Sequence, residues 1–122
     1  MVTLEEFEAF AAGQRAIRHF TDREVPDELV ERLLRAATRA PSARNAQPWR
    51  FVVVRERETK RALGELFDEL GRQFYGAGAP DRTPWEEVPV LIAVCSARDV
   101  FGGGEAGAAA LGASIYPAVQ NL

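Results

Sequence analysis

The 122-residue chain has few of the residues that usually build metal sites and disulfides. One cysteine, Cys95, excludes an intramolecular disulfide, and with a single histidine, His19, the common nitrogen and sulfur metal cages are excluded too. Lysine is nearly absent, with Lys60 as its one occurrence, so arginine supplies almost all the basic charge. Because its planar fork suits phosphate and carboxylate groups, an anion site in this chain is expected to use arginine.

The sequence also lacks a long apolar run and an excess of basic charge. No stretch approaches the ~20 apolar residues of a membrane-spanning helix. The first residues carry acids where a signal peptide would carry bases. A net charge of −3 provides no field for sequence-independent binding of nucleic acid. We therefore expect a soluble, cytoplasmic protein that has neither a membrane nor a nucleic acid as its partner.

The length and an apolar share of 47% fit one folded domain over residues 1–122. Hydrophobic spacing and capping signals predict helices and strands in alternation. The helices begin after Thr3 and after Pro26 and extend over Thr59–Phe74; the buried strands are Trp49–Val54 and Val88–Cys95; residues 76–84 form an exposed loop. Residues 114–122 look like a helix that has only begun, with no stop signal, so we interpret the chain as a fragment of a domain.

Arg15, Arg18 and His19 cluster directly after the first expected helix. Such a segment can supply the forked cationic donors that a phosphate monoester needs. The alternative interpretation is a solvated charged turn.

The loop P-S-A-R-N-A-Q-P, residues 41–48, lies between two prolines and leads into the first strand. Ser42, Asn45 and Gln47 offer neutral donors and acceptors, which match the edge of a heteroaromatic ring such as a pyrimidinedione. The prolines reduce the conformational entropy that the loop loses when it meets a ligand. The alternative is a tight turn whose serine and asparagine satisfy their own backbone.

Gly102, Gly104 and Gly107 have the spacing G-x-G-x-x-G of dinucleotide-binding folds. The glycines do not follow the preceding strand directly, so a flexible loop in the glycine- and alanine-rich residues 102–113 is the favoured interpretation. Cys95 closes an apolar strand and is expected to be a buried structural thiol.

Two stretches, taken together, resemble the N-terminal half of the nitroreductase family. The first is R-A-I-R-H-F-T-D-R-E-V-P-D-E-L-V from Arg15, and the second is A-A-T-R-A-P-S-A-R-N-A-Q-P-W-R-F-V-V-V from Ala36. The ending G-A-S-I-Y-P-A-V-Q-N-L resembles a later helix of the same family. The resemblance implies an α+β fold with helices around a mostly antiparallel sheet, an FMN cofactor, NADH or NADPH as electron donor, and a homodimer.

The same resemblance implies which residues contact the cofactor. Arg15 would hold the FMN phosphate with Ala16 beside it, and Arg18 would lie nearer the ring or the ribityl chain. The loop would contact the flavin, in this family usually from the partner subunit, through Pro41, Ser42, Ala43, Asn45 and Gln47. The later helix, at the dimer interface, would add Gln120 and Asn121. The family often has two adjacent arginines and a serine where this chain has Gln14, Arg15 and Ala16, so one charge and one hydroxyl are missing.

Two functions are open at this point. In the first, the protein is an oxidoreductase that passes electrons from NAD(P)H to a nitroaromatic, a quinone or a related small acceptor, and the flavin carries the chemistry without a catalytic side chain. In the second, it is an inactive flavin-binding or subunit-interaction half-domain, because the family's C-terminal strand, the amide that faces the reactive ring nitrogen and a C-terminal arginine are not in this sequence. A dinucleotide-binding domain would depend on the three glycines alone.

Overall fold

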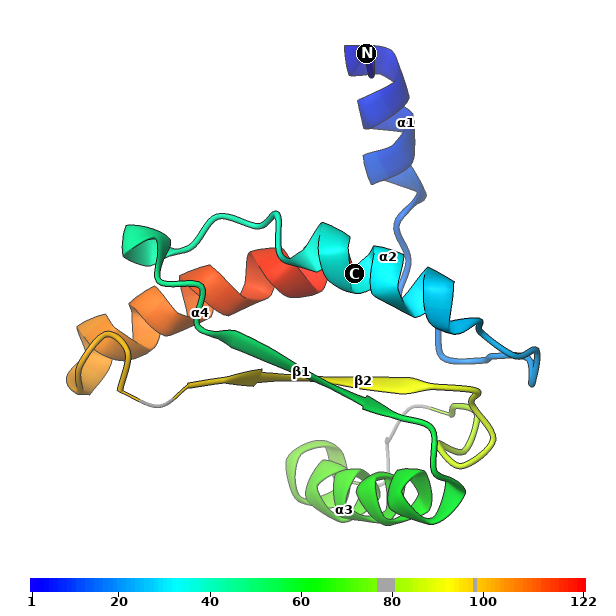
Figure 1. The fold of residues 1–122 in the computed structure, drawn as a ribbon. Coiled ribbons are helices and arrows are strands. Elements are labelled where there is room, and N and C mark those ends of the chain that lie inside the picture. The colour runs from blue at the N-terminus through cyan, green and yellow to red at the C-terminus, as the bar shows by residue number, and fades with distance from the viewer. Residues whose placement is uncertain (77–80, 98) are drawn as a thin grey trace.

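A computed structural model describes residues 1–76, 81–97 and 99–122. Seven elements follow one another: α1 (Leu4–Gly13), α2 (Asp27–Ala37), the short 3-10 helix η1 (Ala43–Asn45), β1 (Trp49–Val54), α3 (Arg57–Tyr75), β2 (Leu91–Ser96) and α4 (Gly104–Asn121). The predicted α+β class is confirmed. In Figure 1, α2 and α4 lie on one side of the two strands, α3 lies on the other, and α1 projects away from the layers.

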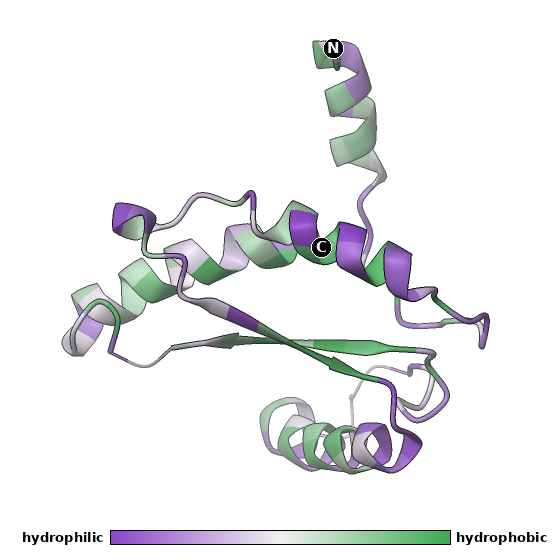
Figure 2. Cartoon of the chain, viewed as in Figure 1, coloured by the Kyte–Doolittle hydropathy of each residue, from purple (hydrophilic) through white to green (hydrophobic). Residues whose placement is uncertain are grey.

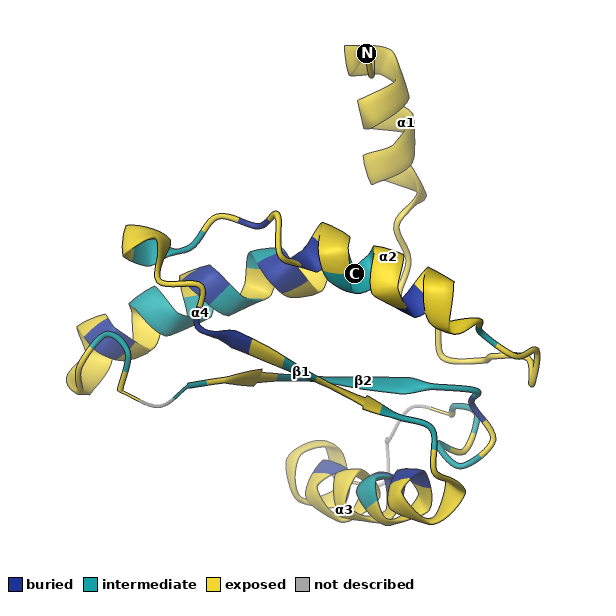
Figure 3. Cartoon of the chain, viewed as in Figure 1, coloured by how far each residue is buried: buried dark blue, intermediate teal, exposed yellow. Residues whose placement is uncertain are grey.

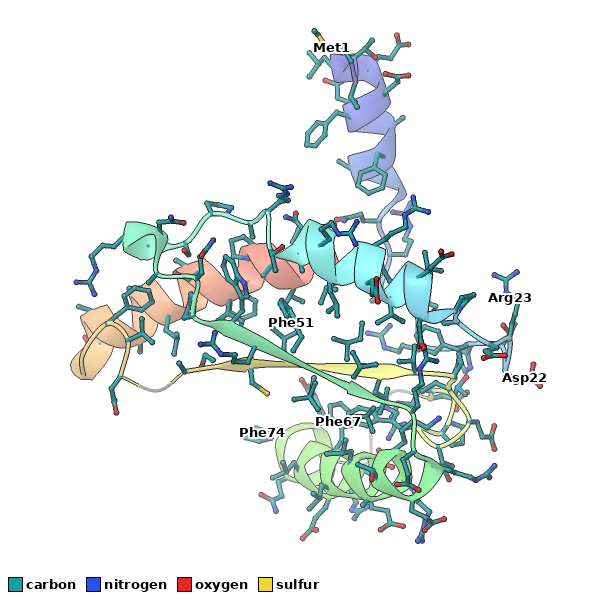
Figure 4. The ribbon with its side chains drawn as sticks, viewed as in Figure 1. Met1, Asp22, Arg23, Phe51, Phe67 and Phe74 are labelled. Carbon is teal, nitrogen blue, oxygen red and sulfur yellow. The ribbon has the colours of Figure 1, made fainter. Side chains whose placement is uncertain are left out.

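β1 and β2 form an antiparallel pair whose register runs from Trp49 opposite Ser96 to Val54 opposite Leu91. Since side chains alternate along a strand, Trp49 and Phe51 share the face toward α4. Trp49 joins Ala37, Ala40 and Ala118 in the buried cluster, and Phe51 packs against it. Figure 4 shows Phe51 between the strands and the helices above them. The core therefore lies between β1, α2 and α4.

The strands are less buried than the sequence predicts. The hydropathy colours in Figure 2 mark both strands as apolar, yet Trp49 is the one fully buried residue of β1, and β2 is only partly covered. Cys95, expected to be buried, is exposed, because it lies near the end of β2 where no helix covers that face. The expectation of a buried structural thiol was therefore wrong.

The ends of the helices follow the predicted signals closely. Thr3 and Glu6 form both hydrogen bonds of the capping box, and α1 ends at Gly13. α2 begins directly after Pro26 but ends at Ala37, and a turn fills the interval before Pro41. α3 begins two residues earlier than predicted, where Glu56 caps its first turn, and ends one residue later. β2 begins at Leu91, three residues later than predicted.

The segment around the three glycines is the largest correction to the predicted elements. It is not a loop over residues 102–113, since α4 begins at Gly104 and continues to Asn121, with Pro117 inside it. The alanines after Gly104 favour a helix. Gly107 lies so close to the preceding turn that a Cβ there would come within 2.1 Å of the Gly102 carbonyl oxygen. The glycines thus allow the backbone to turn closely against the first turn of α4. Of the predicted loop 76–84, residues 77–80 lie outside the described residues.

Lys60 connects α3 to the strand layer from the other side. Its side chain is buried, and Nζ donates to the carbonyl oxygen of Val88 at 2.5 Å. Phe67 of α3 lies 5.0 Å from Trp85, centroid to centroid, and Figure 4 shows Phe67 between α3 and the strands. The apolar stripe of α3 that Leu66, Phe67, Leu70 and Phe74 form is nevertheless exposed, and Phe74 is the most exposed of the four. α3 therefore contacts the rest of the chain through a few side chains, among them Lys60 and Phe67.

Candidate functional site

The arginine segment after α1 is exposed along its whole length. Arg15 Nη1 donates to the carbonyl oxygens of Ala12 at 2.8 Å and Gln14 at 2.6 Å, so the guanidinium covers the C-terminal end of α1. A cation at this end of a helix is favourable, because the helix dipole is negative there. Both interactions are with solvent-exposed carbonyls, and the guanidinium is free to exchange them for an anion.

The rest of this segment is tied to the chain before β2. The backbone N–H of Thr83 donates to the Arg18 carbonyl oxygen at 2.9 Å, and the Phe20 N–H donates to Thr83 Oγ1 at 2.9 Å. His19 Nε2 lies 3.8 Å from Asp81 Oδ2, with both side chains exposed. These contacts fix the backbone of residues 18–20 and leave the Arg15 side chain beside the end of α4.

An open depression of about 600 Å³ joins the arginine segment to the C-terminal end of α4. It brings together three of the predicted cofactor-binding residues, Arg15, Ala16 and Gln120. Gln14, Tyr116, Val119 and Leu122 complete its lining. Arg18 is not in this depression; it lines a separate apolar pocket between α2 and β2.

The loop before β1 holds itself in shape through its own serine. Ser42 Oγ accepts the backbone N–H of Gln47 at 3.0 Å, and the Ser42 carbonyl oxygen accepts the N–H of Asn45 at 2.9 Å. Arg44, Asn45 and Gln47 have positive φ values of 54°, 54° and 47°. A non-glycine residue in this region costs free energy, and such strain is concentrated at functional sites. The loop therefore forms the expected turn, which satisfies its own backbone hydrogen bonds. The amide side chains of Asn45 and Gln47 are exposed and can contact a ligand.

Helix α4 holds the loop before β1 in place through a hydrogen bond. The backbone N–H of Ala43 donates to Ser114 Oγ at 3.0 Å, and the buried Ser114 hydroxyl donates to the Ala110 carbonyl oxygen at 2.8 Å. Arg44 Nη2 donates to the Val100 carbonyl oxygen at 3.3 Å and lies over the Phe101 ring at 5.4 Å. Pro48 is fully buried at the entry to β1. The loop is thus fixed to the middle of α4 and to the segment that precedes this helix.

Within one chain the predicted residues form two groups. Pro41, Ser42, Ala43, Asn45 and Gln47 belong to one loop, which Ala43 attaches to Ser114, whereas Arg15 and Ala16 lie beside Gln120. Six residues of helix separate Ser114 from Gln120, which is about 9 Å along the axis of α4. Asn121 belongs to neither group, because its Nδ2 donates to the Ala36 carbonyl oxygen at 3.3 Å and ties α4 to α2.

Sequence reasoning missed Ser114 and Tyr116. Ser114 supports the loop, and Tyr116 lines the depression with a largely exposed ring. A signal for Ser114 exists, since it is the one serine on an alanine- and glycine-rich helix that has no threonine. Its loop partner lies 71 positions away, and nothing local in the sequence indicates that contact.

Neither a metal site nor a membrane span is found in the described part of the chain. No three His, Cys, Asp or Glu side chains gather there as metal ligands, and none of its helices is long and apolar enough to cross a membrane.

Comparison with known proteins identifies the family. The nitroreductase family model matches residues 11–122. A NADH dehydrogenase of Thermus thermophilus is 38% identical over 111 residues, which cover 91% of this chain and 45% of that protein. A 4-nitrobenzoate reductase of a Nocardioides species is 38% identical over 91 residues, covering 69% of this chain and 36% of the relative.

A solved structure, an FMN-dependent nitroreductase from Clostridium difficile, has the same fold. It superposes with a TM-score of 0.72 at 20% identity, over 93% of this chain and 51% of its own. The protein therefore belongs to the nitroreductase family and has its fold. It spans about half or less of the length of the relatives it matches.

Proposed function

We propose that the protein is an FMN-dependent oxidoreductase that works as a homodimer in the cytoplasm, with NADH or NADPH as its electron donor. The observation that carries the proposal is the depression in which Arg15 and Ala16 lie beside Gln120, although more than a hundred positions separate them in sequence. The family match over residues 11–122 supports it. The two named relatives differ in the reaction for which they are named, so the acceptor belongs to this proposal and not to the family assignment.

The residues present fit the phosphate end of FMN. Arg15 provides a forked cation, and its current partners are two exposed backbone carbonyls that an anion can replace. Ala16 lacks the hydroxyl that the family often places there, so the backbone and Arg15 would carry the contact. Arg18 would contact the ring or the ribityl chain.

The loop residues fit the ring end of FMN. Asn45 and Gln47 present exposed amides from a backbone that Ser42 and Ser114 hold in place. Such amides can pair with the alternating donors and acceptors of the pyrimidinedione edge. FMN, when bound, would supply the redox chemistry, namely hydride uptake from NAD(P)H and electron transfer to an acceptor such as a nitroaromatic or a quinone. The protein's part is to bind, orient and enclose the cofactor.

A homodimer would unite the two groups of residues. The loop group and the Arg15 group are apart on one chain, and a loop from the partner subunit can reach a flavin held at the depression. Pro41 and Ala43 would then shape the loop from one subunit, while Gln120 and Asn121 would lie at the dimer interface.

Flavin titration of the purified chain tests this proposal. We expect quenching of FMN fluorescence on binding, and we expect Arg15→Ala to raise the Kd about tenfold or more, since a charge-assisted hydrogen bond contributes about 1.5–3 kcal/mol. Arg57→Ala, an exposed arginine at the start of α3, is the matched control and should leave the Kd unchanged.

Turnover distinguishes the two open functions. Oxidation of NADH or NADPH with 4-nitrobenzoate or a quinone as acceptor is expected of the oxidoreductase. FMN binding without turnover would favour the flavin-binding half-domain. A chain that binds no flavin would contradict the proposed oxidoreductase and leave the subunit-interaction half-domain.

A further inference from the structure

The segment that carries Arg18 has no regular structure of its own. Residues 14–26 belong to neither a helix nor a strand, and all of them but Val25 are exposed. Figure 3 shows this exposed connection between α1 and α2. Fixing such a segment when a ligand binds costs backbone entropy, which opposes binding. Contacts that hold the backbone in advance therefore favour binding through any side chain on the segment.

Thr83 supplies such contacts from a distant part of the chain. Its backbone N–H donates to the Arg18 carbonyl oxygen at 2.9 Å. Its hydroxyl accepts the Phe20 N–H at 2.9 Å and donates to the Phe20 carbonyl oxygen at 3.5 Å. The backbone is therefore held on both sides of His19, although Thr83 and Phe20 are 63 positions apart.

Thr83 is itself held in place, because its neighbour Arg82 is anchored to α3. The Arg82 guanidinium lies over the rings of Phe67 and Trp85, at 5.4 and 5.0 Å from their centroids. Its Nη2 donates to Asp68 Oδ1 at 2.6 Å. The Arg82 side chain is 14% exposed, and arginine is seldom buried so deeply unless it is paired. The chain before β2 is thus a fixed support, and Thr83 connects residues 18–20 to it.

Arg18 lies between the apolar pocket and the depression that Arg15 lines. It lines the pocket between α2 and β2 together with Thr83. Its Nη1 donates to the Ala16 carbonyl oxygen at 3.5 Å, and Ala16 lines the depression. A hydrogen bond of this length is weak. The position of the Arg18 guanidinium therefore depends mainly on its backbone, which Thr83 holds.

We infer that Thr83 is a positioning residue for the flavin: it fixes the backbone of residues 18–20 and so places the Arg18 guanidinium for the ring or the ribityl chain of FMN. The inference rests on the proposed function and extends it to a part of the chain that contributes no cofactor contact of its own. Thr83 acts through Arg18 and does not touch the flavin.

Removal of the Thr83 hydroxyl tests the inference. Thr83→Val keeps the shape of the side chain and leaves the Phe20 N–H without its partner. We expect the Kd for FMN to rise about threefold to tenfold, the size of one lost hydrogen bond. Thr83→Ser restores the hydroxyl and should restore the Kd. The matched control is Thr38→Val, which removes an exposed hydroxyl that donates to the Arg35 carbonyl oxygen after α2, and it should leave the Kd unchanged.

A double-mutant cycle tests whether Thr83 acts through Arg18. Arg18→Ala should itself raise the Kd for FMN, and Thr83→Val should add little in that background, because the side chain that it positions is gone. Riboflavin, which lacks the phosphate, gives a second readout. Thr83→Val should weaken riboflavin binding by the same factor as FMN binding, whereas Arg15→Ala should weaken FMN binding much more than riboflavin binding.

Hydrogen exchange of the wild-type chain provides a measurement that does not depend on how a variant folds. If Thr83 holds the segment in advance, the Phe20 amide is protected from exchange before FMN is added. The amide of Asp22, in the same exposed segment, serves as the reference and should exchange faster. A Phe20 amide that exchanges as fast as that of Asp22 until FMN binds would contradict the inference.

The outcomes separate this inference from the proposed function. A weakened Thr83→Val variant, recovery in Thr83→Ser and a non-additive cycle would support it. Unchanged FMN binding in Thr83→Val, or a loss that adds fully to that of Arg18→Ala, would overturn it and leave the flavin proposal intact, provided that binding still depends on Arg15. A wild-type chain that binds no FMN would overturn both.

Discussion

At the scale of single residues, a few side chains connect distant segments of the chain. Ser114 is the clearest, because its fully buried hydroxyl accepts the Ala43 N–H from the loop and donates back to α4. Sequence analysis found the loop through its composition but not this support. The reason is physical: a hydrogen bond between positions 71 residues apart depends on the packing of α4, not on any local pattern.

Replacement of Ser114 should therefore destabilise the loop and the fold together. Ser114→Ala leaves the Ala43 N–H without its partner, and an unsatisfied buried donor costs about 1–3 kcal/mol. We expect that decrease in the free energy of unfolding, measured by urea denaturation, along with weaker FMN binding. Ser96→Ala, at an exposed position of β2, should change neither quantity.

Gly107 should tolerate no side chain. A Cβ there would meet the Gly102 carbonyl oxygen at 2.1 Å, so the entry into α4 would have to shift. Gly107→Ala should lower the free energy of unfolding by about 3 kcal/mol, within the range of steric core substitutions. Gly71→Ala in α3 has open space around the added carbon and should be neutral or stabilising by up to about 1 kcal/mol. Equal losses in the two variants would contradict this interpretation of the glycine spacing.

The burial of Cys95 and the role of Arg15 were harder to predict from the sequence. The apolar run before Cys95 predicts burial, yet the thiol is exposed, because it lies at the end of β2, where the last two residues of the strand are exposed. Arg15 was assigned from a family motif, and the structure shows why composition alone left a charged turn open: its present partners are ordinary backbone carbonyls.

At the scale of elements, the sequence predicts most helices and strands through caps and periodicity. The Thr3–Glu6 box and Pro26 mark the starts of α1 and α2 within a residue. The predicted starts of α3 and α4 are too late, by two and ten residues, for different reasons. Glu56 is a less common cap than serine or aspartate, and the glycines of α4 hid a helix whose stability comes from packing on α2 and β1.

The cap of α3 should make that helix sensitive to acid. Glu56 accepts hydrogen bonds from the Thr59 hydroxyl and from the backbone N–H groups of Glu58 and Thr59, and these bonds lower its pKa. A lowered folded-state pKa means that the unfolded chain binds the proton more readily. The stabilisation is therefore present above about pH 4.3, the usual value for glutamate, and is lost as the pH falls through the folded-state pKa below it.

Comparison of wild type with Glu56→Gln tests this directly. The variant should melt a few degrees lower than wild type at pH 7, and the difference in Tm should vanish near the acid end of the titration. Glu69→Gln, in the middle of α3, provides the reference variant. A difference that persisted in acid would mean that the carboxylate charge does not hold the cap.

At the scale of the whole molecule, the chain leaves much apolar surface uncovered. The buried cluster lies between β1, α2 and α4, while most of the apolar stripe of α3, all of α1 and the pocket beside α2 remain open. Sequence patterns predict which residues are apolar but not what covers them. Covering by a second copy would explain both this surface and the separation of the two groups of candidate flavin-binding residues.

The central claim is that this chain builds an FMN site from Arg15 and the loop before β1. The most direct measurement is the visible absorbance spectrum of the purified chain, with and without added FMN, and with any released cofactor identified after denaturation. We expect a yellow protein that releases FMN, and we expect the Arg15→Ala variant to lose this colour. A chain that stays colourless after FMN is added and the excess is removed would contradict the account.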